Sequence, residues 1–381
     1  MHTHNLCALS IDETRLICYD NKKTESAMKK RVTIQDIADA LSISRNTVSK
    51  AINNSDGIAD ATRDMILRKA AEMGYKQFSY IQVAAAAQRA ASAPRGAPEG
   101  PTEIALFTTV FLANSHFASL MLDKLQRELT QLGYTMSTHR VTQRDRDEMA
   151  LPVTFNRDRT AAILCVEMFD RRYDEMVCSL GLPVLFVDGP VKLRGRSLPA
   201  DELYMDNMTE GARFLYEMLD RGVRRIGFIG DYEHCQSFYE RYAVFRWAML
   251  AEGLPVDERF IIKSMTREDI SARLRALEEL PELFLCANDF IAMDTLYILT
   301  DMGLSVPDDV MICGFDDAAE SRLITPALTT IHIHTQSMAF SAAQLLLTRI
   351  REPSLDYRTM YTETELIYRE STRRPEAEDM P

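Results

Sequence analysis

The sequence predicts a small all-α domain of three helices followed by a larger α/β core of two lobes, each built on a doubly wound parallel sheet. Between Thr33 and Tyr75, apolar residues recur at helical spacing in three short runs. Farther along, short apolar runs alternate with helical patterns, which is typical of parallel sheets covered on both faces. This second part spans about 270 residues, more than one core comfortably holds, so we expect two lobes with a ligand cleft between them.

Charge separates the two parts of the chain. The 381 residues carry a formal net charge of −12. Residues 28–77 contain nine Lys and Arg against six Asp and Glu, a local charge of +3 that leaves −15 on the remainder. Only the N-terminal domain therefore suits contact with phosphate groups.

Other bulk features exclude several classes of protein. The scattered cysteines form no CxxC pair, which argues against a disulfide framework or a zinc site and favours reduced thiols in the cytoplasm. No run approaches 18 apolar residues, and residues 1–27 lack the basic start and apolar stretch of a signal peptide. We expect a cytoplasmic protein without a membrane anchor. Residues 1–27 are expected to be a disordered leader, unless translation starts at Met28, and residues 373–381 a tail.

The first helix of the N-terminal domain shows a clear apolar stripe. Thr33 is its expected N-cap, and Asp36, three residues later, fits a capping box. Four apolar residues fall at i, i+3, i+4 and i+7, namely Ile34, Ile37, Ala38 and Leu41.

A short turn leads to a second helix with two distinct faces. Ser44 is its expected cap, and its inward positions are Val48, Ala51 and Ile52. Its outer face is polar and carries Arg45, Asn46, Ser49, Lys50 and Asn53. A third helix, from about Thr62 to Met73, closes the small core with Ile66, Ala70 and Met73. We therefore place the helical domain at residues 28–77.

Residues 78–101 are predicted to be a hinge and linker, because the stretch is poor in large apolar side chains. The expected strands of the core lie in EIALFTTV, AAILCV, PVLFVD, RRIGFIG, LFLCA and VMICGF. The expected helices lie near 117–132, 207–220, 236–250 and 290–302.

These segments resemble the lactose/galactose repressor family of bacterial regulators. The N-terminal match is VTIQDIADALSISRNTVSKAINN followed by T-R and EMGY. PVLFVD, MDNMTEGARFL, RRIGFIGD, YERYAVF, CANDFIAM, VMICGFDD and TPALTTI then follow in family order, so the resemblance covers roughly residues 30–370.

The resemblance implies a helix-turn-helix domain and a periplasmic-binding-protein-like core whose lobes the chain crosses three times. It implies a homodimeric repressor that binds a pseudo-palindromic operator in double-stranded DNA and responds to a small effector. We place the effector-binding and dimerisation core at residues 102–372. Its first lobe is expected at about 102–204 and 336–352, and its second at about 205–332 and 358–370. The C-terminal residues show no apolar heptads, so a dimer is expected rather than a tetramer.

The second helix can read DNA for physical reasons that do not depend on the resemblance. A helix N-terminus in the major groove can place an Arg on guanine and an Asn on adenine. We predict base reading by Arg45, Asn46 and Lys50. Phosphate contacts are predicted for Thr33, Ser44, Thr47, Asn53 and Thr62. The alternative is that these polar residues only solvate an exposed helix face.

The hinge departs from the family pattern. Family members usually have Asn-Pro and then a Leu that wedges into the minor groove, whereas KQFSYIQVAAAAQRA follows Tyr75 here. Ala84 stands where that Leu would fall. Phe78, Tyr80 or Ile81 could replace the wedge, the kink could be absent, or Tyr80, Ile81 and Val83 could pack against the core.

The core effector site is expected to bind a sugar or sugar derivative. A sugar hydroxyl both donates and accepts, so a buried site needs carboxylates, amides and guanidinium groups. The family effector positions correspond to Asp188, Arg241, Asn288 and Asp316, and the NSHF segment adds Asn114 and Phe117. We interpret Asp289 and Asp317 as helix caps. Val244 replaces a usual Gly and Ile333 a polar residue, so the ligand's identity stays open.

Two other functions are weighed and set aside. A plain solute-binding protein would need a signal peptide and no DNA-binding domain. An α/β enzyme could use Asp188, Asp316 and His116 as acid and base, but no phosphate loop, GxSxG or HExxH motif is present. His332 and His334 alternate on a probable strand without a matching third metal ligand. We therefore expect no catalysis, no cofactor and no metal.

Overall fold

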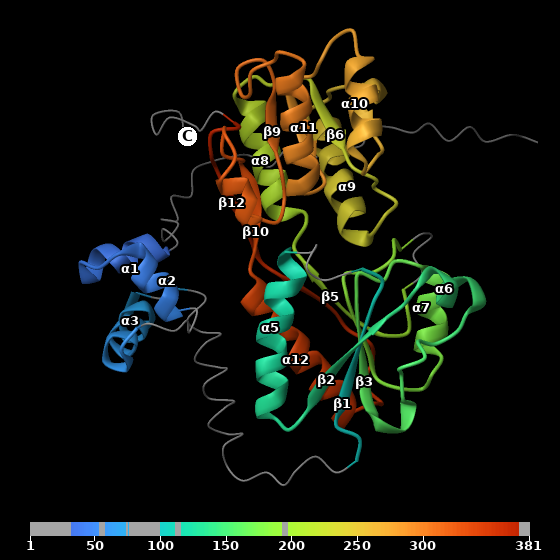
Figure 1. The fold of residues 1–381 in the computed structure, drawn as a ribbon. Coiled ribbons are helices and arrows are strands. Elements are labelled where there is room, and N and C mark those ends of the chain that lie inside the picture. Colours follow the sequence, from blue (N-terminus) through green and yellow to red (C-terminus); the bar gives the residue numbers. More distant parts are fainter. Residues whose placement is uncertain are drawn as a thin grey trace, which may run out of the picture. The chain divides into compact units, whose positions relative to one another are not determined.

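A computed structural model describes residues 32–52, 58–73, 75, 100–110, 116–192 and 197–372 (Figure 1). The chain divides into two compact units, Met1–Gln82 and Val83–Pro381. The predicted leader, the departures expected in the hinge and the C-terminal tail lie outside the described residues.

The first unit is the three-helix domain that the sequence predicts. Its helices are α1 (Ile34–Leu41), α2 (Arg45–Ile52) and α3 (Asp60–Met73), so the third begins two residues earlier than predicted. The capping box at Thr33 and Asp36 is formed. Side chains from all three helices form one core and are at most 1% exposed; they are Ile37, Ala38, Val48, Ala51, Ile66 and Ala70.

The first lobe of the second unit is a parallel sheet of six strands in the order β11-β5-β4-β3-β1-β2. Its strands are β1 (Glu103–Thr108), β2 (Thr135–Arg140), β3 (Thr160–Val166), β4 (Val184–Val187), β5 (Asp201–Met205) and β11 (Thr359–Thr362). Its helices are α5 (His116–Gln131), α6 (Gln143–Glu148), α7 (Arg171–Cys178) and α12 (Thr335–Arg351), with a short 3-10 turn, η2, at Arg157–Arg159. Apolar residues of α5 and α12 pack on one face of the sheet, and those of α7 on the other (Figure 1).

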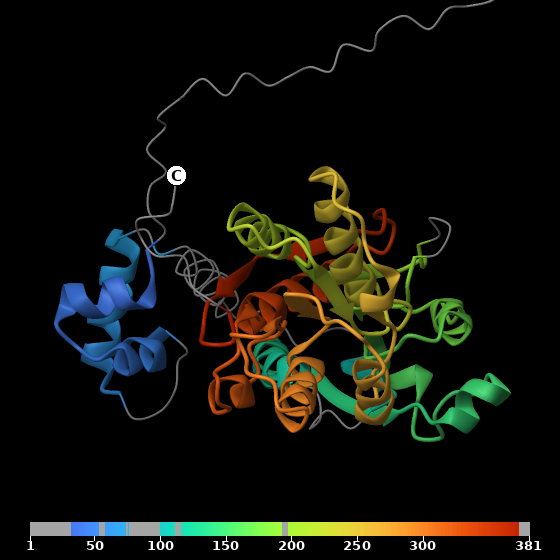
Figure 2. The same ribbon diagram turned by 90° about the horizontal axis from the view of Figure 1, so that it is seen from above.

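The second lobe is a parallel sheet of four strands in the order β7-β6-β8-β9. Its strands are β6 (Ile226–Ile229), β7 (Ile261–Ile262), β8 (Leu283–Cys286) and β9 (Met311–Cys313). Its helices are α8 (Thr209–Asp220), α9 (Gln236–Ala251), α10 (Arg267–Arg275) and α11 (Asp289–Asp301), with 3-10 turns η4 (Glu258–Phe260) and η5 (Ala319–Arg322). β10 (Thr330–Ile333) and β12 (Thr364–Ile367) form a separate antiparallel pair. Viewed from above in Figure 2, the helices of this lobe surround its strands.

The chain passes between the lobes three times. It runs from β5 to α8, returns from β10 to α12, and passes again from β11 to β12. The expectation that residues 358–370 belong wholly to the second lobe was wrong. Residues 359–362 form β11 and pair in parallel with β5 in the first lobe's sheet, because the edge of β5 that β4 does not use accepts one more strand.

Asp289 and Asp317 are not the helix caps that the sequence suggested. The cap of α11 is Asn288, whose Oδ1 accepts from the Ile291 amide at 3.0 Å, while the Asp289 carboxylate turns away to the Ala318 amide and the Thr330 hydroxyl. For α11 the neighbouring Asn288 takes the capping position, and the 3-10 turn after Asp317 has Ala318 at its N-cap, without a side-chain cap. Both aspartates instead hydrogen-bond to neighbouring segments.

The buried Asp317 carboxylate is the centre of an ionic cluster whose cationic partners reach toward the surface. It accepts hydrogen bonds from Arg322, Arg369 and His332, the last at 3.0 Å. Burial alone would raise the pKa of this carboxyl, but these hydrogen bonds and the Arg369 charge outweigh it and lower the pKa below its ordinary value. The cluster ties the loop after β9 to β10 and to the C-terminal segment.

Candidate functional site

The polar face of α2 lies opposite an apolar face that packs into the core of the three-helix domain. Arg45, Asn46 and Lys50 are exposed, while Val48 on the opposite side is completely buried. The Thr47 amide donates to Ser44 Oγ at 3.0 Å, and the two hydroxyls lie 2.7 Å apart. Because one hydroxyl hydrogen suffices for that contact, the other stays available for a phosphate.

The remaining predicted phosphate contacts differ in their surroundings. The Thr33 hydroxyl and amide both donate to the Asp36 carboxylate at 2.7 Å, so neither donor is free for a phosphate while the capping box holds. Thr62 is half-buried in the first turn of α3. Asn53 lies outside the described residues.

Arg241 occupies the centre of the polar cluster in the core. The residue is 4% exposed, and its guanidinium stacks on Phe315, with 3.5 Å from the guanidinium carbon to the ring centroid. Its Nε donates to Asn207 Oδ1 at 3.0 Å, its Nη1 donates to the Ala287 carbonyl at 2.6 Å, and Nη1 lies 3.6 Å from Asp316 Oδ1. Among the described residues, Nη2 has no hydrogen-bond partner. Arg241 and Asp316, which the sequence placed in one site, are thus neighbours.

Asp188 joins the two lobes directly. It follows β4 in the first lobe, and its Oδ1 accepts from its neighbour Gly189 at 2.9 Å and from the Ser237 amide of α9 in the second lobe at 3.3 Å. The Gln236 amide of α9 also donates to the Gly189 carbonyl at 2.9 Å. Burial raises the pKa of Asp188, although the Gly189 amide and the Arg241 charge lower it in part. The Asp188 carboxylate therefore accepts a hydrogen bond from the N-terminus of α9, a helix of the opposite lobe, where a negative charge is favourable.

Asn288 and the loop residue Asp316 stand beside this cluster. Asn288 uses its carbonyl oxygen to cap α11, and its amide nitrogen donates to no described residue. Asp316 has a φ of 112°, an unusual value for a residue other than glycine. Asn114 lies outside the described residues, as does the side chain of Phe117.

Several polar residues near Arg241 were not predicted from the sequence. They are buried and belong to α9 or to the passage from β5 to α8; they are Asn207, Gln236, Ser237 and Glu240. The signal was present in QSFYER, where polar residues at i, i+1, i+4 and i+5 share one face of an otherwise apolar helix. Such a stripe on a helix that follows a parallel strand points to the lobe boundary.

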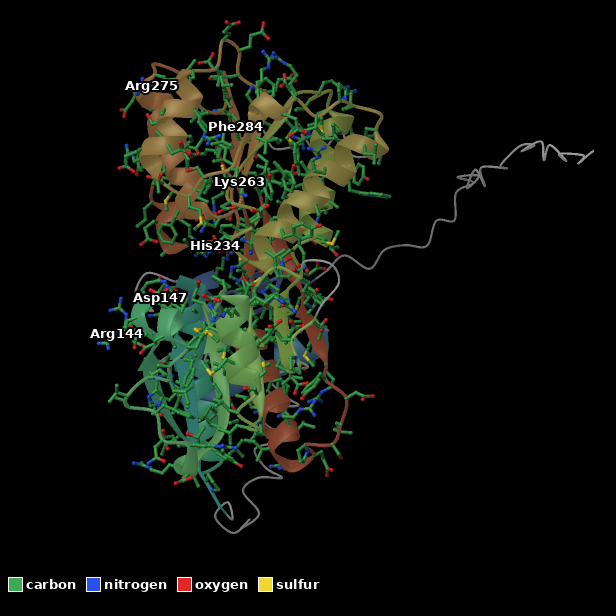
Figure 3. The ribbon with its side chains drawn as sticks, turned by 90° about the vertical axis from the view of Figure 1, so that its right-hand side faces the viewer. Arg144, Asp147, His234, Lys263, Arg275 and Phe284 are labelled. Carbon is green, nitrogen blue, oxygen red and sulfur yellow. The ribbon has the colours of Figure 1, made fainter. Side chains whose placement is uncertain are left out.

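Aromatic side chains also meet at the boundary between the lobes. Phe169 follows β3 in the first lobe, and its ring packs edge-on against His234, which precedes α9, at 4.7 Å between centroids. Figure 3 shows His234 where the two lobes approach each other. Burial lowers the pKa of His234, while Asp231 opposes that shift. A largely neutral imidazole on an aromatic ring gives this side of the boundary an apolar character.

Two of the positions at which the sequence departs from the family are part of the hydrophobic core. Val244 is 2% exposed and Ile333 is 1% exposed. His332 and His334 contact each other edge-on at 5.1 Å between ring centroids. Within the described ranges, no group of three or more His, Cys, Asp or Glu side chains could hold a metal ion, and no helix is long and apolar enough to cross a membrane.

Two family models match the chain. The model described as bacterial regulatory proteins, lacI family, matches residues 33–77, and the periplasmic binding protein-like domain matches residues 216–372. This chain belongs to the lacI family. The lacI-type helix-turn-helix domain and the periplasmic-binding-protein-like core predicted from the sequence are therefore confirmed.

Relatives of this lacI-family chain align over nearly its whole length. It is 24% identical over 351 residues to the HTH-type transcriptional repressor PurR of Vibrio parahaemolyticus, covering 90% of this chain and 99% of the relative. It is 27% identical over 352 residues to PurR of Actinobacillus pleuropneumoniae, covering 90% and 98%. These relatives are transcriptional regulators, and the lacI-family chain is a DNA-binding transcriptional regulator like them.

Solved structures of this family share the fold. The complex of the transcriptional regulator CelR with cellobiose has a TM-score of 0.61 and 22% identity, covering 90% of this chain and all of that one. The lac repressor dimer bound to operator and the anti-inducer ONPF has a TM-score of 0.59 and 19% identity, covering 90% and 99%. At these sequence identities, the similarity to the solved structures is evidence for the fold alone.

Proposed function

We propose that this chain is a cytoplasmic repressor that binds a pseudo-palindromic operator as a homodimer and is controlled by a small polar effector between its lobes. The observation that carries the DNA part is the exposed polar first turn of α2, which is fixed from behind by buried Val48 and capped by Ser44. In this proposal Arg45, Asn46 and Lys50 read base edges. Ser44, Thr47, Asn53 and Thr62 contact phosphates, and Thr33 does so only where the capping box opens.

The test is operator binding by the purified full chain. DNA from its own promoter and a scrambled duplex of equal length are compared over 50–200 mM salt by fluorescence anisotropy. We expect the promoter to be favoured by a factor of about 10³ or more, and affinity for both duplexes to fall steeply with salt. Equal affinity for the two duplexes, with and without candidate effectors, would refute the proposal.

The effector part rests on the mixture of donors and acceptors around Arg241. Asp188 and Asp316 supply carboxylates, and Arg241 and Asn288 supply N–H groups with few or no partners among the described residues. Asn114 and Phe117 complete the proposed set. A ligand rich in hydroxyl groups can satisfy both kinds of group at once, so we propose a sugar or sugar derivative. Its preference for one lobe angle would change operator affinity by about 1–3 kcal/mol, as induction or as co-repression.

The effector test uses a panel of sugars and nucleosides in a thermal-shift screen. A compound that raises the melting temperature of the wild type is then tested on Arg241→Lys, whose single ammonium cannot reproduce the guanidinium contacts. Arg246→Lys is the matched control, because Arg246 lies on the same helix with a 42% exposed side chain paired to Glu258. Binding that survives Arg241→Lys unchanged would contradict the assigned site.

A further inference from the structure

We infer that Glu240 is a positioning residue that ties the orientation of Arg241 to the angle between the lobes, with Tyr361 as its contact on the first lobe. The inference rests on the proposed function in one respect, namely that Arg241 binds the effector. Its geometric content, a hydrogen-bonded chain from the first lobe to Arg241, stands independently.

Glu240 accepts hydrogen bonds that connect it to the first lobe. Tyr361 of β11 donates its hydroxyl to Glu240 Oε1 at 3.0 Å. Gln236 donates its amide to the same oxygen at 2.9 Å, while its own side-chain oxygen accepts from the Lys192 amide of the first lobe at 2.9 Å. The Glu240 carboxylate on this second-lobe helix is therefore connected to two separate segments of the first lobe, directly through Tyr361 and indirectly through Gln236 and Lys192.

The side-chain amide of Asn207 links Glu240 to Arg241 by hydrogen bonds. Its Oε2 accepts from Asn207 Nδ2 at 2.8 Å, and Asn207 Oδ1 accepts from Arg241 Nε at 3.0 Å. Asn207 is 1% exposed, and Ser237 Oγ accepts its other N–H at 3.2 Å, so the orientation of the amide is fixed. Glu240 Oε2 and Ser237 Oγ both accept from the N–H side of this amide, and Glu240 is the charged acceptor of the two. Loss of the Glu240 carboxylate is therefore expected to let Asn207 shift and release Arg241 Nε.

Tyr361 is suited to report a change of lobe angle. Its ring stacks on Tyr204 of β5, with centroids 5.4 Å apart, so the phenol moves with the first lobe's sheet. Among the contacts of the described residues, only the hydroxyl of Tyr361 joins it to α9. A rotation of the lobes by a few degrees would stretch this hydrogen bond before the ring contact is disturbed, since hydrogen bonds weaken steeply with distance and angle.

The lobe contact can be measured without DNA or effector. The amides of Gln236 and Ser237 donate across the lobe boundary to Gly189 and Asp188, so their hydrogen exchange reports opening of the lobes. In the full chain, Tyr361→Phe keeps the ring and removes the hydroxyl. We expect exchange in the peptide that contains these two amides to accelerate roughly tenfold, as the loss of one hydrogen bond to a carboxylate implies.

Tyr368→Phe is the matched control. The Tyr368 hydroxyl donates to Glu217, and both residues belong to the second lobe. This variant is expected to leave exchange at Gln236 and Ser237 unchanged, with a loss of thermal stability similar to that of Tyr361→Phe. Unchanged exchange in Tyr361→Phe, or equal acceleration in both variants, would overturn the inference.

Two further measurements test the link through Glu240. In a Glu240→Met background, Tyr361→Phe should cause no further acceleration, because the acceptor of its hydrogen bond is already absent. A crystal structure of Glu240→Met should show the contact between Arg241 Nε and Asn207 Oδ1 lost. If Glu240→Met folds poorly, Glu240→Leu serves the same cycle, because it also lacks an acceptor. Additive effects, or a retained Arg241 contact, would overturn the positioning role even if operator and effector binding are confirmed.

Discussion

A buried carboxyl in the first lobe makes the stability of this protein depend on pH near neutrality. Asp174 on α7 is completely buried, and both of its carboxyl oxygens lack a hydrogen-bond partner among the residues that the structure describes. Burial, with some help from the neighbouring charge of Asp170, raises its pKa to about 8. The folded protein therefore keeps this carboxyl protonated at pH 7, whereas the unfolded chain ionises it near its ordinary pKa of 3.8.

The sign and size of the effect follow from this difference. Below the unfolded pKa both states are protonated and the group costs nothing through ionisation. As pH rises from about 4 to about 8, the unfolded state alone loses the proton, and the folded state loses about 1.4 kcal/mol of relative stability per pH unit. The accumulated penalty is about 4 kcal/mol at pH 7. Asp174→Asn has nearly the same shape and cannot ionise, so it should stabilise the protein by about that amount at pH 7 and by little at pH 4.

The assay is urea unfolding of wild type and Asp174→Asn at five pH values between 4.5 and 8.5, at fixed protein concentration because a dimer's stability depends on it. The difference in unfolding free energy should widen steadily with pH and level off above about pH 8. Asp147→Asn on α6 is the control, because Asp147 is exposed (Figure 3) and should change stability by less than about 0.5 kcal/mol at every pH. A difference that does not vary with pH, or a less stable Asp174→Asn, would refute the reasoning.

Three further predictions concern the other parts of the chain. Arg45→Ala should relax base preference at one position of each half-site, at a cost of about 1–3 kcal/mol, whereas Thr47→Ala should weaken all duplexes alike; anisotropy titrations on a set of single-base operator variants distinguish the two. Asp317→Asn should destabilise the second lobe by about 3 kcal/mol at pH 7, because Arg369 then loses its buried partner. Since the folded pKa of Asp317 is lowered, the stability that it contributes is fully present above the unfolded pKa of about 4 and is lost gradually as pH falls from there through the folded pKa. The difference between the two proteins should therefore be smaller at pH 3 than at pH 7, as thermal melts at the two pH values would show. Gly314→Ala should be strongly destabilising, because its Cβ would lie 2.2 Å from Asp289 Oδ1; a melting temperature within 2 °C of the wild type's would contradict this.

Sequence patterns were most informative where one residue's environment is set by its immediate neighbours. The three helices of the DNA-binding domain follow from apolar spacing and two caps. The strands β1, β3, β4, β6, β8 and β9 follow from continuous apolar runs. The exposed edge strand β2 escaped prediction, since its sequence TMSTHR alternates weakly and has only one buried side chain. The strand β11 was misplaced because nothing local in TMYT tells which of two sheets it joins.

The candidate effector site shows the same limit. Arg241 and Asp316 were predicted from the family resemblance, and the structure brings them within 3.6 Å. Asn207 and Glu240 were missed, because their importance lies in hydrogen bonds between residues more than 30 positions apart. A sequence pattern can mark a polar helix face, but it does not show which partners that face meets.

The place of β11 has a consequence for how the chain is made. The second lobe's four-stranded sheet lies within one continuous stretch, 226–313, and can form as soon as that stretch has left the ribosome. The first lobe begins earlier in the chain, yet its sheet waits for residues 359–362 before its last edge is covered. Of the two parallel sheets, the one whose first strand is synthesised earlier is therefore expected to be completed later, with an open strand edge exposed in the meantime. Premature termination shortly before residue 359 would leave that edge permanently open, and the truncated product should aggregate although its DNA-binding domain is intact.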